Sequence, residues 1–301
     1  MKSRKHTETT RKGHGNLRVL LCLVMLIFQL STSTATAQSP VITRATSVAI
    51  GHIRQQDTYL SPLDYSGTQL SYLKESQRAV TLFGRTLERQ AFFQLDLTTT
   101  ESPAHNADYL GGLLHFDEAW YYCLLPKTMR ELQDSKAMKI IKSFTDLSKP
   151  NMLSLSIGPQ LGGSLGTLYN TRNGNNPAQL IAEVHLAVSA QAAYPFHLWK
   201  RRFTIRDQVD VPLIGAMFSP NYGQSYYELF SLGHTDHNVC LTQPFNAPSL
   251  RNQLTLDFRL WKQTFRVGYL LDIRQSHVND LRRHNINHAF LIGWVRHFQR
   301  L

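Results

Sequence analysis

The chain has 301 residues, of which 42% are hydrophobic and 18% are charged, and its formal net charge is +11. This balance excludes a disordered chain. A mean hydropathy of −0.27, without any stretch of the about 20 apolar residues that a spanning helix needs, excludes a helical membrane protein. Three cysteines are too few for a disulfide scaffold, so a globular or β-barrel protein remains.

Residues 1–37 have the three parts of a secretory signal peptide. Residues 1–18 hold six basic residues and one acid, Val19–Leu30 is almost entirely apolar, and Ala35–Ala37 is a small-residue exit. We expect cleavage after Ala37, which leaves residues 38–301 as a single domain. Because the leader carries part of the excess charge, the net charge then falls from +11 to +6, and nucleic-acid binding loses its main support.

The mature chain alternates apolar and polar residues with a period of two. The alternation is clearest over 178–192, 202–213, 250–260 and 264–274. Ordinary strands have about 5–6 residues, whereas tilted membrane-spanning strands need about 9–11. The pattern therefore predicts an all-β, antiparallel, up-and-down transmembrane β-barrel, in which lipid-facing and lumen-facing residues alternate. A soluble secreted β-protein with one solvated face is an alternative.

Eleven segments are strand candidates. They are 43–56, 65–76, 85–99, 109–125, 151–168, 178–192, 201–218, 226–241, 250–260, 263–275 and 286–298. A single-chain bacterial barrel normally has an even number of strands. We therefore expect about 12, with 10 as the alternative.

The C-terminal segments resemble a known group of proteins. The last strand closes on Phe298, and LYNTRNGNNPAQ (168–179), LRNQLTLDF (250–258) and TFRVGYLLDIRQS (264–276) are similar to an uncharacterised family of single-chain bacterial outer-membrane barrels. The resemblance implies a location in the outer membrane of a Gram-negative bacterium, in contact with its lipid. It also implies recognition by the barrel-assembly machinery through the strand that ends at Phe298. No activity and no catalytic residue carry over from the family.

Loop lengths suggest a topology if Phe298 lies at the periplasmic end. The short connection at 261–262 is then periplasmic, and alternate connections place 193–200 outside and 170–177 inside. Residues 126–150 become the longest outer loop, with the spacing of a short amphipathic helix. Cys123 and Cys240 survive in the mature chain, and their separation alone does not decide whether they pair.

One local sequence resembles a hydrolase site. In Gly233–Asn238, the residues His234, Asp236 and His237 are candidates for an outer-membrane lipid hydrolase acting at the barrel wall. Such enzymes place a nucleophilic serine two residues after a histidine, and here Asp236 holds that place. We therefore expect no catalytic site. We also expect no metal and no cofactor, because the histidines of the last strands lack a tight ligand spacing.

Four charged residues are expected to form a ladder across the lumen. If strands 250–260 and 263–275 form a hairpin in which Phe258 faces Phe265, then Asp257 faces Arg266 and Arg251 faces Asp272. A neighbouring register would place two arginines opposite each other. The sequence thus predicts a monomeric, non-catalytic barrel with a structural, surface-interaction or narrow-conduit role.

Overall fold

The computed structural model describes residues 41–82, 85–125, 153–174, 176–198 and 201–299. The leader predicted at 1–37 and the loop and helix predicted at 126–150 lie outside these residues.

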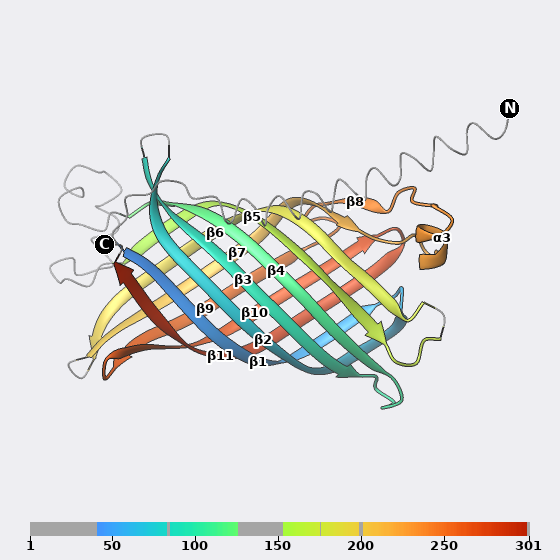
Figure 1. The fold of residues 1–301 in the computed structure, drawn as a ribbon, viewed down its shortest axis with the longest axis horizontal. Coiled ribbons are helices and arrows are strands. Elements are labelled where there is room, and N and C mark those ends of the chain that lie inside the picture. The colour runs from blue at the N-terminus through green and yellow to red at the C-terminus, as the bar shows by residue number, and fades with distance from the viewer. Residues whose placement is uncertain (1–40, 83–84, 126–152, 175, 199–200, 300–301) are drawn as a thin grey trace.

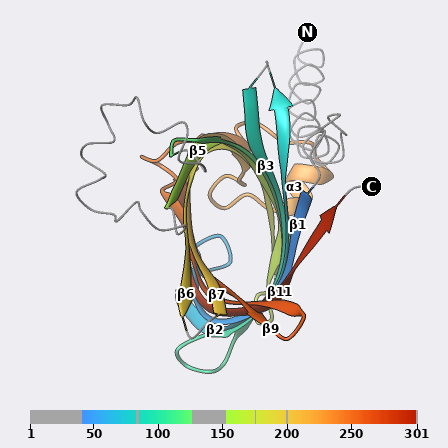
Figure 2. The ribbon, with the colours of Figure 1, turned by 90° about the vertical axis from the view of Figure 1, so that its left-hand side faces the viewer.

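Ten antiparallel strands close into one barrel, as Figures 1 and 2 show. They are β1 (Val41–Asp57), β2 (Ser61–Leu82), β3 (Arg85–Glu101), β4 (Asp108–Cys123), β5 (Ser154–Asn170), β6 (Ala178–Leu198), β7 (Arg201–Phe218), β9 (Ser249–Leu260), β10 (Gln263–Val278) and β11 (Leu281–Gln299). Each strand pairs with its neighbour in the chain, and β1 pairs with β11 from Val41↔Gln299 to Asp57↔Arg283. The up-and-down barrel predicted from the alternation is confirmed, and the ten-strand alternative describes the closed ring.

An eleventh strand completes the wall beside β7. β9 pairs with β7 from Phe203 to Asp210, and the short β8 (Val239–Thr242) pairs with Gly215–Phe218 of the same strand. Since β6 covers the other edge of β7, β8 and β9 share one edge, separated by residues 243–248.

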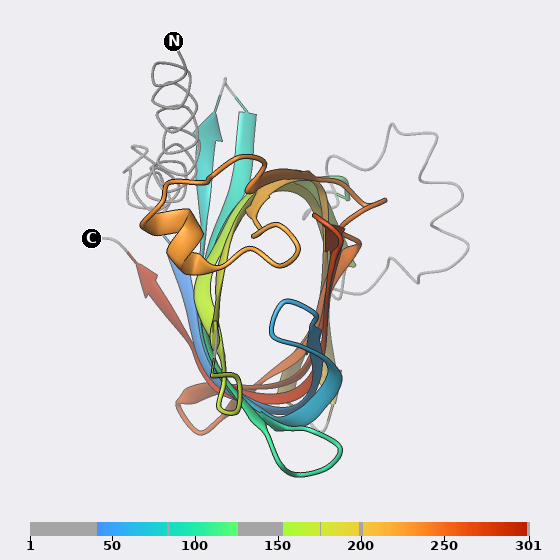
Figure 3. The ribbon, with the colours of Figure 1, turned by 90° about the vertical axis from the view of Figure 1, so that its right-hand side faces the viewer.

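The candidate strand at 226–241 is not one crossing of the wall. Its first residues form the helix α3 (Tyr226–Phe230), which begins with a capping box between Ser225 and Glu228. Leu229 of α3 packs against Ala182 and Phe218, and Figure 3 shows the helix outside the ring. No helix in the described part of the chain is long and apolar enough to cross a membrane.

Because 226–241 does not cross the wall, the expected loop positions change. We call the end that holds Val41 and Gln299 the terminal end, and the end that holds α3 the loop end. Leu198 and Arg201, which flank the β6–β7 connection, lie at the terminal end, and Asn170 and Ala178, which flank the β5–β6 connection, lie at the loop end. Cys123 and Ser154 flank the predicted long outer loop, and both lie at the same end as Phe298 rather than opposite it. These positions reverse those predicted relative to Phe298.

The outer surface carries a continuous apolar band. Large exposed side chains alternate with buried ones on nearly every strand, and they include Val48, Ile50, Leu70, Leu97, Leu110, Ile157, Leu186, Ile205, Leu254, Tyr269, Phe290 and Ile292. Toward the terminal end, five aromatic rings form a row across β6, β7, β9 and β10, with successive centroids 5.4–6.2 Å apart. They are Tyr194, Phe196, Phe203, Phe258 and Phe265. This row is the arrangement that aromatic residues adopt at a membrane interface.

Candidate functional site

The β9–β10 hairpin has the register expected from its charges. Phe258 faces Phe265, Asp257 faces Arg266, and Arg251 faces Asp272. Alternation places the two phenylalanines on the outer surface and the charged residues in the lumen. The four residues of the expected ladder therefore all lie inside the barrel, where Arg266 bonds to Asp257 but Arg251 and Asp272 take other partners.

A group of four side chains, Glu75, Arg206, Asp257 and Arg266, crosses the lumen, and we call it the ion-pair ladder. Arg266 is 1% exposed, and its guanidinium donates to Asp257 at 2.7 and 2.8 Å and to Glu75 at 2.7 Å. Glu75 on β2 also accepts from Arg206 on β7 at 2.9 Å. The ladder thus ties three separate parts of the wall together, and Glu75 holds two arginines.

A neutral polar layer follows toward the loop end. Gln90 donates to Glu75 and to Gln208, each at 3.0 Å, and accepts from Tyr121 at 2.7 Å and from Gln191 at 3.0 Å. All four of these partners come from different strands. The layer fills the lumen with side chains whose donors and acceptors satisfy one another.

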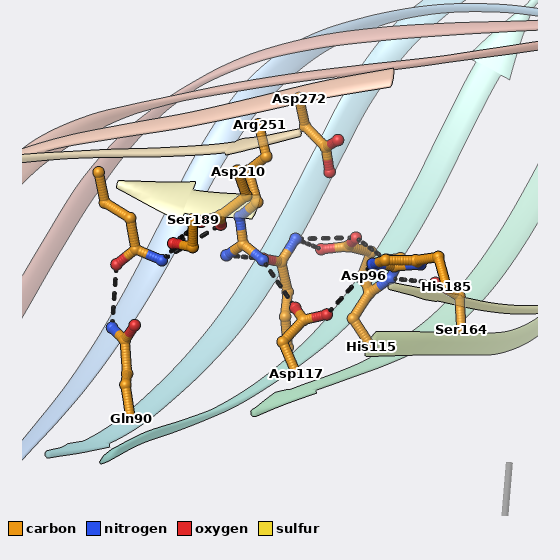
Figure 4. A network of polar contacts seen from close by, with 12 residues as sticks. Gln90, Asp96, His115, Asp117, Ser164, His185, Ser189, Asp210, Arg251 and Asp272 are labelled. Atoms are coloured by element: carbon orange, nitrogen blue, oxygen red, sulfur yellow. Dashed lines mark hydrogen bonds and ion pairs between the residues drawn. The ribbon is translucent and has the colours of Figure 1, made fainter. Parts of the chain in front are cut away.

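Arg251 and Asp272 face each other in the register but bond to other residues. Arg251 crosses to β3 and β4, where it donates to Gln94 at 2.9 Å and to Asp117 at 3.3 Å, and its guanidinium carbon lies 3.8 Å from the centre of the Phe92 ring. Asp272 is bound by Arg274 of its own strand. Figure 4 shows Arg251 reaching across to Asp117.

A serine, a histidine and an aspartate lie in line beside these residues (Figure 4). Ser164 Oγ is 2.7 Å from His115 Nδ1, and His115 Nε2 is 3.0 Å from Asp96 Oδ2. The three residue types are those of a hydrolase triad. However, Arg274 Nη1 lies within 3.2 Å of both imidazole nitrogens and Ser164 is buried, so the arrangement fits hydrogen-bonded packing better than attack on a substrate.

A cavity of about 80 Å³, which we call the loop-end chamber, lies between this line and Arg251. Its charged lining consists of four carboxylates (Asp117, Glu183, Asp210 and Asp272), three arginines (Arg251, Arg274 and Arg283) and the two histidines His115 and His185. Each arginine pairs with a different carboxylate, with Asp117, Asp272 and Glu183 respectively. Asp210 is the remaining carboxylate.

A larger cavity of about 750 Å³, which we call the terminal vestibule, opens on the other side of the ion-pair ladder. Its lining is strongly basic and contains Arg202, Arg206, Arg259, Lys262 and Arg296 with one acid, Asp257. The ladder therefore separates a basic compartment at the terminal end from the chamber at the loop end.

The three hydrolase candidates lie in the connection between α3 and β8. His234, Asp236 and His237 are exposed, and the bonds that hold this segment go to their backbone carbonyls, from Gln224, Asn221 and Asn279. Their side chains form no hydrogen bond or ion pair with one another. Within the described residues, no group of three or more His, Cys, Asp or Glu side chains could hold a metal ion. Cys123 and Cys240 are free thiols.

The sequence reasoning missed most of the lumen, including Glu75, Gln90, Asp96, His115, Asp117, Gln160 and Asp210. A signal for several of them was present. Asp96 alternates with Leu95 and Leu97, and Asp117 follows Phe116 in the same pattern, so a period of two on β3 and β4 assigns both acids to the inner face.

Comparison with solved structures finds barrels of low similarity. The translocator domain of the autotransporter NalP from Neisseria meningitidis is 9% identical over 97% of this chain and 98% of that chain, with a TM-score of 0.37. The outer membrane protease OmpT from Escherichia coli is 8% identical, with coverages of 89% and 100% and a TM-score of 0.42. The COG4313 outer membrane channel from Pseudomonas putida F1 is 12% identical, with coverages of 88% and 99% and a TM-score of 0.35.

No curated protein matches the chain. A family model matches it over residues 18–301, nearly its whole length, and is described as a protein of unknown function, DUF3316. The resemblance to an uncharacterised family is thereby confirmed, and the chain belongs to the DUF3316 family.

Proposed function

We propose that this protein is an integral barrel of the outer membrane of a Gram-negative bacterium and that its own side chains close the lumen. The apolar band supports the membrane location, because exposed apolar patches on soluble monomers are usually no larger than a few hundred Å². The closed ring also differs from the two packed sheets of a soluble sandwich. In this proposal residues 1–37 are cleaved on export, and the strand ending at Phe298 is the part that the assembly machinery recognises.

The observation that carries the closed lumen is the ion-pair ladder. Arg266 is almost completely buried between Glu75 and Asp257, and Glu75 reaches Arg206 on another wall. Water and ions cannot pass through this layer without breaking buried ion pairs, which is costly. The role is therefore that of a surface-interaction or ligand-holding barrel rather than an open pore.

Three measurements test this proposal. Membrane fractionation followed by gels of heated and unheated samples should place the chain in the outer membrane and show a mobility shift on heating, and intact mass should show loss of residues 1–37. In planar bilayers the purified barrel should show no large steady conductance. A soluble protein without a mobility shift refutes the location, and porin-like conductance refutes the closed lumen.

A further inference from the structure

The loop-end chamber contains a buried carboxylate whose hydrogen bonds all come from neutral groups. Asp210 is 6% exposed and accepts hydrogen bonds from Ser189 and, at 3.0 and 3.2 Å, from Gln208, all of them neutral donors. Arg251 lies opposite Asp210 in the β7–β9 register, but its guanidinium bonds to Asp117 and Gln94 instead. Among the described residues, no arginine, lysine or histidine forms an ion pair with Asp210.

A second group in the chamber lacks a hydrogen-bond donor. Gln160 on β5 lines the same cavity, is 3% exposed, and its Oε1 atom has no partner in the described structure. Buried polar atoms are nearly always paired, so an orphaned acceptor beside a cavity indicates a missing donor. A cation that carries N–H groups would therefore satisfy both, because Asp210 has no ion-pair partner among the described residues and Gln160 Oε1 has no hydrogen-bond donor.

We propose that the loop-end chamber binds a small primary ammonium ion, R–NH₃⁺, between Asp210 and Gln160. An ammonium group supplies a positive charge and three N–H donors at one atom. One donor goes to the Asp210 carboxylate and one to Gln160 Oε1, and the Asp117 carboxylate lines the same cavity. The cavity of about 80 Å³ is well above the roughly 10–15 Å³ that one water molecule needs, so it admits a small ammonium ion such as methylammonium.

The donor set favours an ammonium ion over a metal ion. Divalent cations take six or more oxygen ligands or several imidazoles, and no such group occurs among the described residues. A single unpaired carboxylate with a neutral amide oxygen is suited to a monovalent cation that binds through directed hydrogen bonds. The ion-pair ladder closes the barrel on the terminal side of the chamber, so the ligand enters from the loop end.

Calorimetric titration of the full barrel in detergent with methylammonium at neutral pH tests the site. We expect saturable binding that tetramethylammonium, which has the same charge but no N–H group, does not displace. Asp210→Asn should weaken binding at least about tenfold, because it removes the negative charge that attracts the ammonium ion. Gln160→Leu should weaken it several-fold, because it removes the amide acceptor. Asp64→Asn, on the outer surface beside Arg54, is the matched control and should leave binding unchanged.

A third variant, Gln160→Glu, keeps the test decisive if the other two variants fail to fold. It keeps the shape of the side chain and adds a charge, so it should tighten methylammonium binding by about tenfold while the mobility shift on heating is kept. Equal displacement by tetramethylammonium or by potassium overturns the proposal. So does binding that Asp210→Asn and Gln160→Glu leave unchanged, and so does an absence of binding at 100-fold excess over the protein.

Discussion

Arg206 and Glu75 lie on different walls of the barrel, 131 residues apart in the chain, and their side chains meet inside the lumen at 2.9 Å. Glu75 bonds at the same time to Arg266, which is itself held by Asp257. The contact therefore connects β2 with β7 and β10 without any backbone pairing between them. In this barrel the side chains of the interior connect strands that the backbone does not pair.

Replacing Arg266 by methionine should destabilise the barrel by about 3–5 kcal/mol, because Asp257 then keeps a buried charge without its partner and Glu75 loses one of its two. Denaturant unfolding in lipid vesicles, followed by tryptophan fluorescence, measures the difference. Arg296→Met in the terminal vestibule removes an arginine of the same size from an exposed position and should cost no more than about 0.5 kcal/mol. Equal effects of the two changes would show that the ladder does not brace the wall.

Two glycines should respond oppositely to alanine. At Gly158 a Cβ atom would lie 1.8 Å from the backbone oxygen of Trp120, so the β4–β5 pair must separate. Gly158→Ala should cost about 1–3 kcal/mol in the same unfolding assay. At Gly112 the nearest atom, in the Leu97 side chain, is 4.0 Å away, so Gly112→Ala should be neutral or slightly stabilising.

A polar pair on the outer face offers a test of the lipid-facing surface. Asn252 donates to Asp207 at 2.6 Å, and the cross-strand neighbours of the two are apolar, namely Ala192, Val209, Leu254 and Leu271. Asn252→Leu alone should cost about 1–3 kcal/mol, since it leaves the Asp207 carboxylate without its donor. Asp207→Leu combined with Asn252→Leu should recover that loss in vesicles. A double variant less stable than the single one would place this face outside the lipid.

The start of α3 should loosen in acid. The backbone N–H and the hydroxyl of Ser225 both donate to Glu228, and these bonds hold the pKa of its carboxyl below the ordinary value of 4.5. A lowered pKa means that the cap is complete above about pH 4.5 and is lost as the pH falls through the lower folded value. Amide hydrogen exchange at Glu228 and Leu229, corrected for intrinsic rates, should therefore quicken in acid. Glu228→Ala should exchange quickly at every pH.

The β9–β10 hairpin could be predicted from sequence because two signals agreed there. The alternation of apolar residues and the pairing of opposite charges selected the same register, and the two strands, β9 and β10, are neighbours in one short hairpin. In 226–241 the apolar residues suggested a strand, yet Ser225 and Glu228 have the spacing of a helix cap, which is a local signal for the helix found. One miscounted crossing then reversed the expected positions of several connections relative to Phe298.

The chamber could not be assembled from the sequence. Gln160, Asp210 and Asp117 lie on three different strands, and their distances depend on how the closed ring flattens and on how each side chain bends. Arg251 illustrates this limit. Its register partners are Asp210 and Asp272, but its long side chain reaches past both and forms an ion pair with Asp117. That Asp210 has no ion-pair partner among the described residues is therefore visible only in three dimensions.

The pairing of β1 with β11 has a consequence for how the barrel can be built. The first and last described strands share seventeen register pairs, from Val41↔Gln299 to Asp57↔Arg283. Until β11 is in place, β1 keeps a free edge that any other strand could occupy. Closure must therefore wait for the final segment of the chain. Conversely, a chain cut at the Asn279–Asp280 turn and joined near residues 41 and 299 would make β11 and β1 a local hairpin and would move the long-range closure to the β10–β11 pair.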